Sequence, residues 1–522
     1  MVQGTGSHVG KSTLVAALCR IYAQAGYRVA PFKAQNMSNN AAVTDDGREV
    51  GRAQAVQAMA AGIAVTVDMN PILLKPQSDR TSQIVILGRP RRSADAREYY
   101  DLKSELWPVV TSALDRLRGA CDLVILEGAG SPAEVNLSQY DIVNMRIARY
   151  ADAPVLLVGD IDRGGVFASL FGTIALLQPE ERALVRGFII NKFRGDRSLL
   201  TPGFEMMRER TGIPTLGTLP YLDLSRVPEE DALNWEGLRR GGAAQAVINI
   251  AVMRLPRVAN LDEFQALARE PGVRLRFIGR SDELGEPDLI VIPGTKSTLA
   301  DLAWLRERGL DDAIRDRLVR GIPILGICGG FQMLGDRLID EHGAEGICDA
   351  EGLGLLPVTT EFSPEKVTRR VTARVAAATA LCDPAYSVAS GTSLPASGRL
   401  SDAPLDAYEI HMGRTYPSPS RSTTDLGAAP FVATSSQGTE PDGISSADGL
   451  VVGTYLHGLL ENDILRRALV EVLAARKGVH LPAASPANTV EQAFNSLAAA
   501  VREHVDLSAI DDMVGLPPVN SR

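Results

Sequence analysis

Short runs of consecutive apolar residues recur along this chain, separated by stretches with helical periodicity. In the first 220 residues the runs lie at 28–32, 84–87, 123–126, 154–158 and 187–191. After a polar segment, a second series lies at 247–253, 289–293, 322–327 and 449–455. Runs that are apolar on both faces are typical of parallel strands with helices on both sides of the sheet. The pattern therefore predicts an α/β fold with two doubly wound sheets.

The length of 522 residues also indicates more than one hydrophobic core. We expect a first domain at residues 1–225, a linker at 226–246, and a second domain at 247–465. Within the second domain, residues from about 382 to 447 are rich in Ser, Thr, Pro, Gly and Ala, which predicts a loop-rich insert. Residues 466–522 are expected to form C-terminal helices and a tail.

Composition excludes several classes of function. The formal net charge of −9 offers no basic field for a phosphate backbone, so we expect no nucleic-acid partner. No apolar run reaches the length of a membrane span and no secretory signal is evident, so we expect no membrane partner. The five cysteines are scattered and form no CxxC pair, which favours a reduced cytoplasmic protein. The sequence leaves the oligomeric state open.

A glycine-rich loop at residues 4–12, GTGSHVGKS, leads into an amphipathic stretch that ends at Gly26. Backbone N–H groups of such a loop can hold phosphates, while the lysine meets the β- and γ-phosphate oxygens and the serine can bind Mg²⁺. A plain turn is the alternative. The predicted ATP contacts are Gly4, Thr5, Gly10, Lys11, Ser12 and Thr13. Because only residues 1–3 precede the loop, its strand is either very short or begins upstream of the sequence.

An acidic residue, Glu127, follows the apolar run LVIL at 123–126. Open α/β sheets bind ligands at the carboxyl ends of their strands, and a carboxylate there suits Mg²⁺. We therefore expect Ser12 and Glu127 to hold the metal. A helix-capping glutamate in a turn is the alternative interpretation.

The second series contains GICGG at 326–330, between an apolar run and a helical stretch, with Cys328 at the turn. Flanking glycines permit a strained nucleophile elbow, and a helix N-terminus favours the thiolate. His457 ends the run at 449–455 and is the expected base. The turn PGTKST at 293–298 follows another run, so Gly294 and Gly329 are expected to supply N–H groups to an oxyanion. The other cysteines are expected to be structural.

The elbow, the distant histidine and the PGTKST turn resemble a class I glutamine amidotransferase domain, with a flavodoxin-like fold. That family implies attack by Cys328 on the side-chain amide of glutamine, with His457 moving protons and ammonia released. Its usual third member is a glutamate two residues after the histidine, where this chain has Leu459. The departure points to a Cys–His dyad and leaves open what orients His457.

The first domain resembles the P-loop domain of dethiobiotin synthetase, and the whole chain resembles the cobyric acid synthase family. The strings that carry this resemblance are PFKAQNMSNN at 31–40, GRAQ at 51–54, EGAGSP at 127–132, DIDRGGVFA at 160–168, NKFRGD at 191–196 and YEIHMG at 408–413. The resemblance implies amidation of the b, d, e and g carboxylates of adenosylcobyrinic acid a,c-diamide, a corrinoid, with ATP, Mg²⁺ and L-glutamine. Substrate contacts are then expected from Lys33, Gln35, Asn36, Asp141 and Asp162, and an adenine contact from Asn191.

Two other functions are kept as alternatives. The first is cobyrinic acid a,c-diamide synthesis on the same scaffold, which the string at 31–40 disfavours. The second is a partitioning-type P-loop ATPase of the ParA kind with an inactive amidotransferase domain. Those ATPases carry a signature lysine early in the loop, whereas residues 4–6 here are Gly, Thr and Gly.

Overall fold

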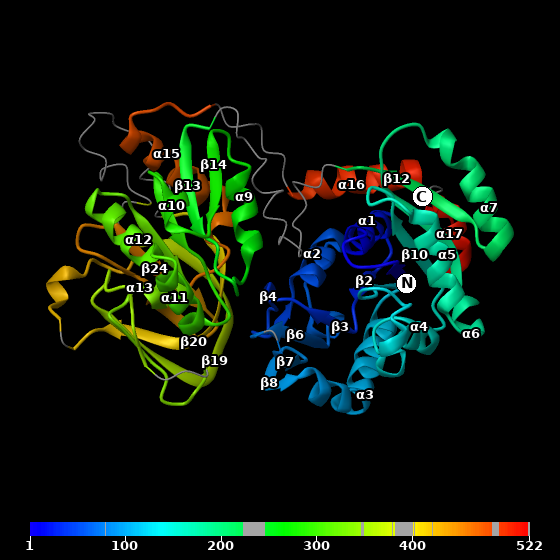
Figure 1. Ribbon diagram of the computed structural model, residues 1–522, viewed down its shortest axis with the longest axis horizontal. Helices are drawn as coiled ribbons and strands as arrows, with labels where there is room; N and C mark the ends of the chain where they lie inside the picture. The colour runs from blue at the N-terminus through cyan, green and yellow to red at the C-terminus, as the bar shows by residue number, and fades with distance from the viewer. Residues whose placement is uncertain are drawn as a thin grey trace. The chain divides into compact units, whose positions relative to one another are not determined.

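The computed structural model describes residues 1–222, 246–381, 400–482 and 490–519, apart from Asp79, 346–348, 378, 380, 401 and 420. The chain divides into two compact units. The described residues of unit 1 are 1–38, 48–222 and 490–519, and those of unit 2 are 39–47 and 246–482. The expected linker at 226–246 lies almost wholly outside the described residues. Figure 1 labels the elements of both units.

Unit 1 is built on a parallel sheet. Its strands pair in the order β1-β10-β11-β12, and a second pair, β2-β9, joins them where Val2 bridges to Glu127. The strands are β1 Val2–Gly4, β2 Val29–Phe32, β9 Leu123–Leu126, β10 Val155–Asp160, β11 Val185–Phe193 and β12 Thr215–Pro220. Leu156 and Val158 of β10 join one hydrophobic cluster while Val155 and Leu157 join another, so both faces of the sheet are buried. The doubly wound fold is confirmed for this unit.

Helices cover both faces of this sheet. Its main helices are α1 Lys11–Gln24, α2 Arg52–Ala61, α3 Ala96–Ala120, α4 Met145–Ala151, α5 Val166–Leu176, α6 Pro179–Arg182 and α7 Thr201–Thr211. A smaller sheet carries β3 Gln35–Met37, β6 Ile72–Pro76, β7 Thr81–Ile86 and β8 Arg89–Asp95, and β5 Glu49–Gly51 precedes α2. The predicted run at 84–87 falls in β7, which pairs antiparallel with both neighbours and lies outside the main sheet. Apolar content alone does not distinguish these two kinds of strand.

The C-terminal helices complete the core of unit 1. Both α16 Val490–His504 and α17 Leu507–Val514 contribute side chains to the cluster around α1. The hydroxyl of Tyr22 in α1 donates to Asp511 Oδ1 at 2.8 Å, in a buried contact. The chain therefore returns to the N-terminal core after it has built unit 2.

Replacing Phe494 with alanine is expected to lower the free energy of unfolding of unit 1 by about 3–5 kcal/mol, because the ring is fully buried. Chemical denaturation of the whole chain, monitored on the transition of unit 1, measures the change. Leu199→Ala is the matched control, since that side chain is 77% exposed and its loss is expected to change little. Equal effects of the two substitutions would contradict the packing of α16 in this core.

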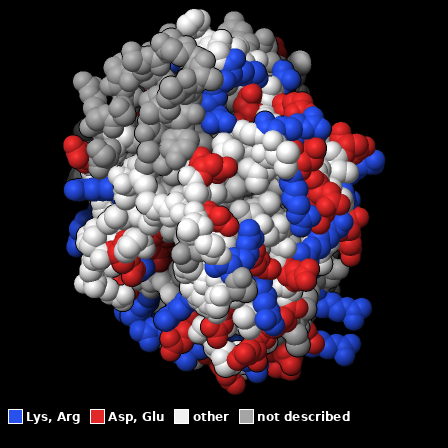
Figure 2. Space-filling model, turned by 90° about the vertical axis from the view of Figure 1, so that its left-hand side faces the viewer, with Lys and Arg blue, Asp and Glu red and all other residues white. Residues whose placement is uncertain are grey.

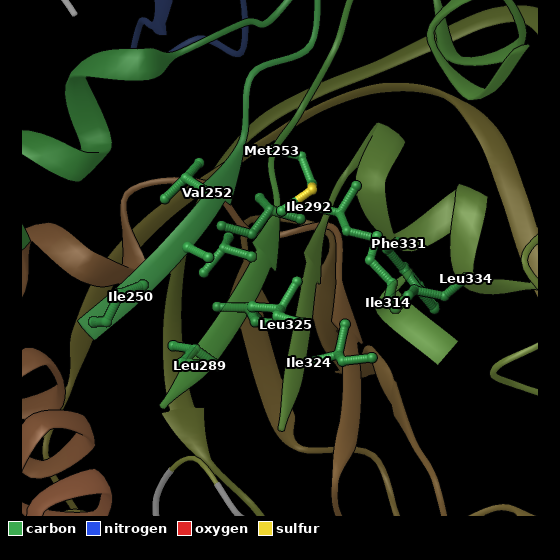
Figure 3. Close-up of a cluster of buried hydrophobic side chains, with 14 of the residues drawn as sticks. Ile250, Val252, Met253, Leu289, Ile292, Ile314, Ile324, Leu325, Phe331 and Leu334 are labelled. Atoms are coloured by element: carbon green, nitrogen blue, oxygen red, sulfur yellow. The ribbon is translucent and has the colours of Figure 1, made fainter. Parts of the chain in front are cut away.

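Unit 2 contains a second parallel sheet in the order β14-β13-β15-β16-β24-β23, with only β23 antiparallel to its neighbour among the described strands. The strands are β13 Ile248–Met253, β14 Val273–Ile278, β15 Leu289–Ile292, β16 Ile324–Ile327, β23 Ile444–Ser445 and β24 Val451–Thr454. Its helices are α9 Gln265–Ala268, α10 Ser281–Leu284, α11 Thr298–Glu307, α12 Leu310–Val319, α13 Gly329–Leu334 and α15 Asp463–Lys477. Figure 3 shows side chains of β13, β15 and β16 meeting Ile314 of α12 and Phe331 of α13 in one apolar core.

A second sheet in unit 2 corrects the sequence analysis. It contains β17 Arg337–Ile339, β18 Ala350–Glu351, β19 Val358–Val375, β20 Leu405–Pro417, β21 Phe431–Ser435 and β22 Gly438–Asp442. Within the expected loop-rich insert at 382–447, residues 405–417, 431–435 and 438–442 form strands of this sheet, while 382–399 lie outside the described residues. The longest of these strands, β20, pairs antiparallel with β19 over most of its length.

The short strand β4 Ala41–Val43 belongs to the compact unit 2, although residues on both sides of segment 39–47 belong to unit 1. It packs against β19 and β20.

No helix among the described residues is long and apolar enough to cross a membrane. On the face of the molecule in Figure 2, basic and acidic side chains lie among one another toward the right-hand and lower edges.

Candidate active sites in the two units

The glycine-rich loop of unit 1 joins β1 to α1, as predicted. Lys11 begins α1, and its Nζ donates to the carbonyl oxygens of Gly6 at 2.7 Å and Gly130 at 3.1 Å. Gly10 precedes the helix with a φ of 96°, a backbone conformation that would be strained in a residue with a side chain. The ammonium group of Lys11 is thus held over the loop at the N-terminus of α1, where anions bind favourably.

Two residues near the end of β11 donate side-chain hydrogen bonds to the backbone of the loop. Asn191 Nδ2 donates to the carbonyl oxygen of Val9 at 2.9 Å, and Lys192 Nζ donates to that of His8 at 2.7 Å. Lys192 also pairs with Asp160 at the end of β10, at 2.8 Å. Asn191 therefore lies at the predicted nucleotide site, and its amide nitrogen supports the backbone of the loop.

Glu127 lies where β9 ends and is the centre of a buried polar cluster. Its Oε1 accepts hydrogen bonds from Ser12 Oγ at 2.8 Å and Lys33 Nζ at 2.9 Å, and its Oε2 accepts one from Gln57 Nε2 at 2.5 Å. Burial raises the pKa of Glu127, but the Lys33 ammonium and the two neutral donors outweigh burial and hold this pKa below its ordinary value. The carboxylate is therefore ionised at neutral pH, as a cation ligand must be.

Ser12 and Glu127 are brought together as the sequence predicted. Among the described residues, no group of three or more His, Cys, Asp or Glu side chains could hold a metal ion by itself. A hydroxyl and one carboxylate fit the small protein share of a Mg²⁺ site that takes its other oxygens from phosphates and water. The alternative of a helix-capping Glu127 is not supported, because its two oxygens accept from side chains and not from a helix terminus.

The predicted substrate residues are not all gathered at one place. Lys33 is close to the loop through Glu127, while Gln35 Oε1 accepts from the Tyr99 hydroxyl at 2.6 Å. Asn36 is buried in the same stretch. Asp141 instead accepts backbone N–H groups at the start of α4, from residues 143, 144 and 146. Asp162 is exposed beside Arg194, which lies 3.5 Å away.

Cys328 lies at a sharp turn between β16 and α13 in unit 2. Its φ of 51° is in the left-handed region, which a non-glycine residue enters at a cost. The turn is fixed by the hydrogen bond from the Cys328 N–H to Thr454 O at 2.8 Å and by the close approach of Gly330 to Ile292. A Cβ on Gly330 would lie 1.9 Å from Ile292 O, so a glycine is required there. These features match the predicted nucleophile elbow.

His457 follows the end of β24 by three residues and is 1% exposed, and its ring lies near the Cys328 side chain. Its other partner, which sequence reasoning missed, is Glu263 of the 3-10 helix Leu261–Phe264. Glu263 Oε1 lies 3.4 Å from His457 Nδ1, and Oε2 accepts the Gly458 N–H at 3.3 Å. Burial lowers the pKa of His457, but Glu263 and the bond to Cys328 outweigh it and raise the pKa from 6.5 to about 10.

The expected oxyanion donors converge on the same place. Gly329 begins α13, so its N–H is among those that the helix leaves unbonded. A Cβ on Gly329 would lie 3.2 Å from Thr295 N, and one on Gly294 would lie 2.8 Å from His457 Cε1. The PGTKST turn is held by Asp301, whose Oδ2 accepts from the Thr295 hydroxyl at 2.5 Å. Turn, elbow and imidazole therefore lie close together.

The string YEIHMG at 408–413 lies on β20 beside the nucleophile. Tyr408 and His457 exchange backbone hydrogen bonds at 3.2 and 2.9 Å, and their rings stack at 5.4 Å. Cys328 Sγ donates to Ile410 O at 3.4 Å. His411 stacks on Tyr455 with ring centroids 3.9 Å apart. This strand, which lies within the expected loop-rich insert, therefore contacts both Cys328 and His457.

Two different family models match the N-terminal and the C-terminal part of the chain. Residues 1–234 match the family model of the CobQ/CobB/MinD/ParA nucleotide binding domain, and residues 249–464 match that of the CobB/CobQ-like glutamine amidotransferase domain. Among solved structures, a crystal structure of a glutamine amidotransferase matches with a TM-score of 0.30 at 17% identity, covering 43% of this chain and 98% of that one.

Similarity to curated proteins extends over almost the whole chain. Cobyric acid synthase of Sorangium cellulosum (strain So ce56) is 52% identical, covering 99% of this chain and 98% of that protein. Cobyric acid synthase of Dehalococcoides mccartyi (strain ATCC BAA-2266 / KCTC 15142 / 195) is 47% identical, covering 98% and 97%. Cobyric acid synthase of Yersinia enterocolitica serotype O:8 / biotype 1B (strain NCTC 13174 / 8081) is also 47% identical, covering 98% and 96%. The chain therefore belongs to the cobyric acid synthase family.

Proposed function

We propose that this chain is an ATP- and glutamine-dependent ligase of cobalamin biosynthesis. It converts the b, d, e and g carboxylates of adenosylcobyrinic acid a,c-diamide into amides and yields adenosylcobyric acid. The observation that carries the proposal is similarity to cobyric acid synthases along almost the whole chain. The reduced cysteines of the described residues are in keeping with a cytoplasmic location.

Unit 2 supplies ammonia. The Cys328 thiolate attacks the side-chain amide carbon of glutamine, and the N–H groups of Gly294 and Gly329 stabilise the oxyanion that forms. His457 holds the thiol proton as an imidazolium and passes it to the leaving nitrogen, so that ammonia departs and a thioester remains. Water activated by His457 then hydrolyses the thioester to glutamate and regenerates Cys328. The raised pKa of His457 supports its acceptance of the thiol proton.

Unit 1 activates the acceptor. A carboxylate is a poor electrophile, so its oxygen first attacks the γ-phosphorus of ATP, with ADP leaving and an acyl phosphate forming on the corrinoid. Lys11 and the N–H groups at the start of α1 stabilise the charge on the transferring phosphoryl group. Ammonia then attacks the acyl carbon, a proton is lost, and phosphate departs to leave the amide.

The residues present fit a magnesium ion. Ser12 Oγ and Glu127 Oε1, 2.8 Å apart, would hold it together with phosphate oxygens. When bound, the ion would neutralise charge on the β- and γ-phosphates. Lys33 and Gln57 keep the Glu127 carboxylate ionised and fixed in direction, which this role requires.

The corrinoid carboxylates are proposed to bind to the residues that follow β2. Lys33 pairs with Glu127 at 2.9 Å, and Gln35 and Asn36 begin β3 shortly after it. Asp141 and Asp162 are proposed to position the substrate, and Asn191 to border the adenine. Asp141 already accepts a hydrogen bond near the start of α4, Asp162 lies beside Arg194, and Asn191 donates to the glycine-rich loop. Contacts with substrate or adenine would therefore use the remaining polar atoms of these side chains.

Incubation with each corrinoid, ATP and glutamine, followed by mass spectrometry, tests the proposal. We expect the a,c-diamide to gain an amide at each of the b, d, e and g positions. Conversion of cobyrinic acid only as far as the a,c-diamide would instead identify the chain as an a,c-diamide synthase. ATP hydrolysis without amidation of either corrinoid would favour the ParA-type alternative.

A further inference from the structure

The catalytic histidine of unit 2 lacks the glutamate that usually follows it two residues later, because Leu459 stands there and is buried and apolar. An imidazole that moves protons needs a partner to fix its tautomer and its orientation. The groups that face His457 are Cys328 at the start of α13, Tyr408 on β20 and Glu263 on the 3-10 helix at 261–264. Of these three, only Glu263 can carry a negative charge toward Nδ1.

The contacts of Glu263 are those of an orienting carboxylate. Its two oxygens reach different parts of the same region, Oε1 the His457 ring at 3.4 Å and Oε2 the Gly458 N–H at 3.3 Å. The carboxylate therefore fixes the ring relative to its own backbone. Both side chains are almost fully buried, at 2% and 1% exposure, so water does not screen the attraction. With Nδ1–H donated to Glu263, Nε2 is left to face Cys328.

The local fold explains why Glu263 lies there. Asn260 adopts a left-handed φ of 54° and turns the chain into the short helix that carries Glu263. Hydrogen bonds in both directions join this turn to the segment 39–47. Asn260 Oδ1 accepts from Ala41 N at 3.0 Å, and Asn40 Oδ1 accepts from Leu261 N at 3.3 Å. Asn40 ends the string PFKAQNMSNN, so the position of Glu263 depends on a segment that follows the proposed substrate residues in sequence.

We propose that Glu263 is the third member of the glutaminase site, a positioning residue that orients His457 from the opposite end of the domain's sequence, and that Asn40 and Asn260 hold its turn. The proposal rests on the proposed function of Cys328 as the nucleophile. It replaces the expected dyad with a triad whose carboxylate comes from the 3-10 helix after β13.

Measuring kcat and KM for glutamine hydrolysis against pH in Glu263→Gln tests the assignment. The expected kcat falls by about 10²–10⁴-fold, because the amide no longer stabilises the imidazolium or selects its tautomer. Loss of the negative charge lowers the pKa of His457, so the alkaline limb of the profile moves to lower pH by about 1–3 units. Glu263→Asp keeps the charge and is expected to lie between wild type and Glu263→Gln in both quantities. Asn40→Ala is expected to lower kcat less than Glu263→Gln.

Glu270→Gln is the matched control, since Glu270 is also a buried carboxylate of unit 2 but pairs with Arg466 at 2.9 Å. It is expected to reduce stability and leave the alkaline limb unmoved. An unmoved limb in folded Glu263→Gln would overturn the proposal, and so would wild-type behaviour of Glu263→Asp if the glutamine variant does not fold. Because Cys328→Ser is assayed alongside, glutamine hydrolysis that survives that substitution would reveal failure of the proposed function instead.

Discussion

Cys328→Ser is expected to lower glutamine hydrolysis by at least about 10³-fold, because a serine hydroxyl beside His457 is a far weaker nucleophile than a thiolate. The substitution is nearly isosteric, so the strained turn and the packing of α13 against β15 should persist. Amidation of the corrinoid from free ammonia should therefore continue, since that reaction uses only unit 1. Parallel assays of glutamate release and of amidation with ammonium salts measure both outcomes.

Cys121→Ser is the control, because this cysteine caps α3 far along the sequence from either site and is expected to be inert. Glutamate release that persists in Cys328→Ser would refute Cys328 as the nucleophile. Loss of ammonia-dependent amidation in the same variant would mean that the cysteine also serves the ligase reaction, which the present mechanism does not allow.

Glu127→Gln is expected to give the opposite pattern. Amidation should fall by about 10²–10³-fold with either glutamine or ammonia, because one oxygen of the proposed cation site loses its charge. The glutaminase reaction should be unchanged, since the side-chain hydrogen bonds of Glu127 to described residues go to Ser12, Lys33 and Gln57, all in unit 1. Steady-state assays of both activities, with ATP and Mg²⁺ varied, provide the measurement.

The control for this variant is Glu98→Gln, an exposed carboxylate that caps α3 and should affect neither activity. If Glu127→Gln retained full ammonia-dependent amidation, the placement of the ATP site at β9 would be wrong. A joint loss of both activities would instead indicate a folding defect, which the unfolding transition of unit 1 detects.

Much of both sites could be predicted because the signals are local. The loop at 4–12, the carboxylate after LVIL and the elbow around Cys328 each combine a strand end, a turn and a helix start within a dozen residues. In a parallel sheet such strand ends meet at one edge, so Ser12 and Glu127 could be paired across more than a hundred residues. The roles of these residues in catalysis remain predictions.

What sequence reasoning missed depends on contacts between distant segments. Glu263 lies in an ordinary acidic turn, and only the fold brings it to His457, 194 residues later in the sequence. The strand β20 lies within a stretch rich in small and polar residues, and its long pairing with β19 decides its conformation. In the same way, nothing in the periodicity of α16 indicates that Phe494 completes the core around α1.

Transfer of the amide nitrogen of glutamine to the corrinoid is the central step of the proposed reaction, and an isotope label follows it. Wild-type protein is incubated with amide-¹⁵N glutamine, ATP, Mg²⁺ and adenosylcobyrinic acid a,c-diamide, and the corrinoid product is analysed by mass spectrometry. Each new amide at the b, d, e and g positions is expected to carry ¹⁵N. A corrinoid that remains a diamide while glutamate and ADP accumulate, or one whose new amides lack the label, would contradict the proposed reaction.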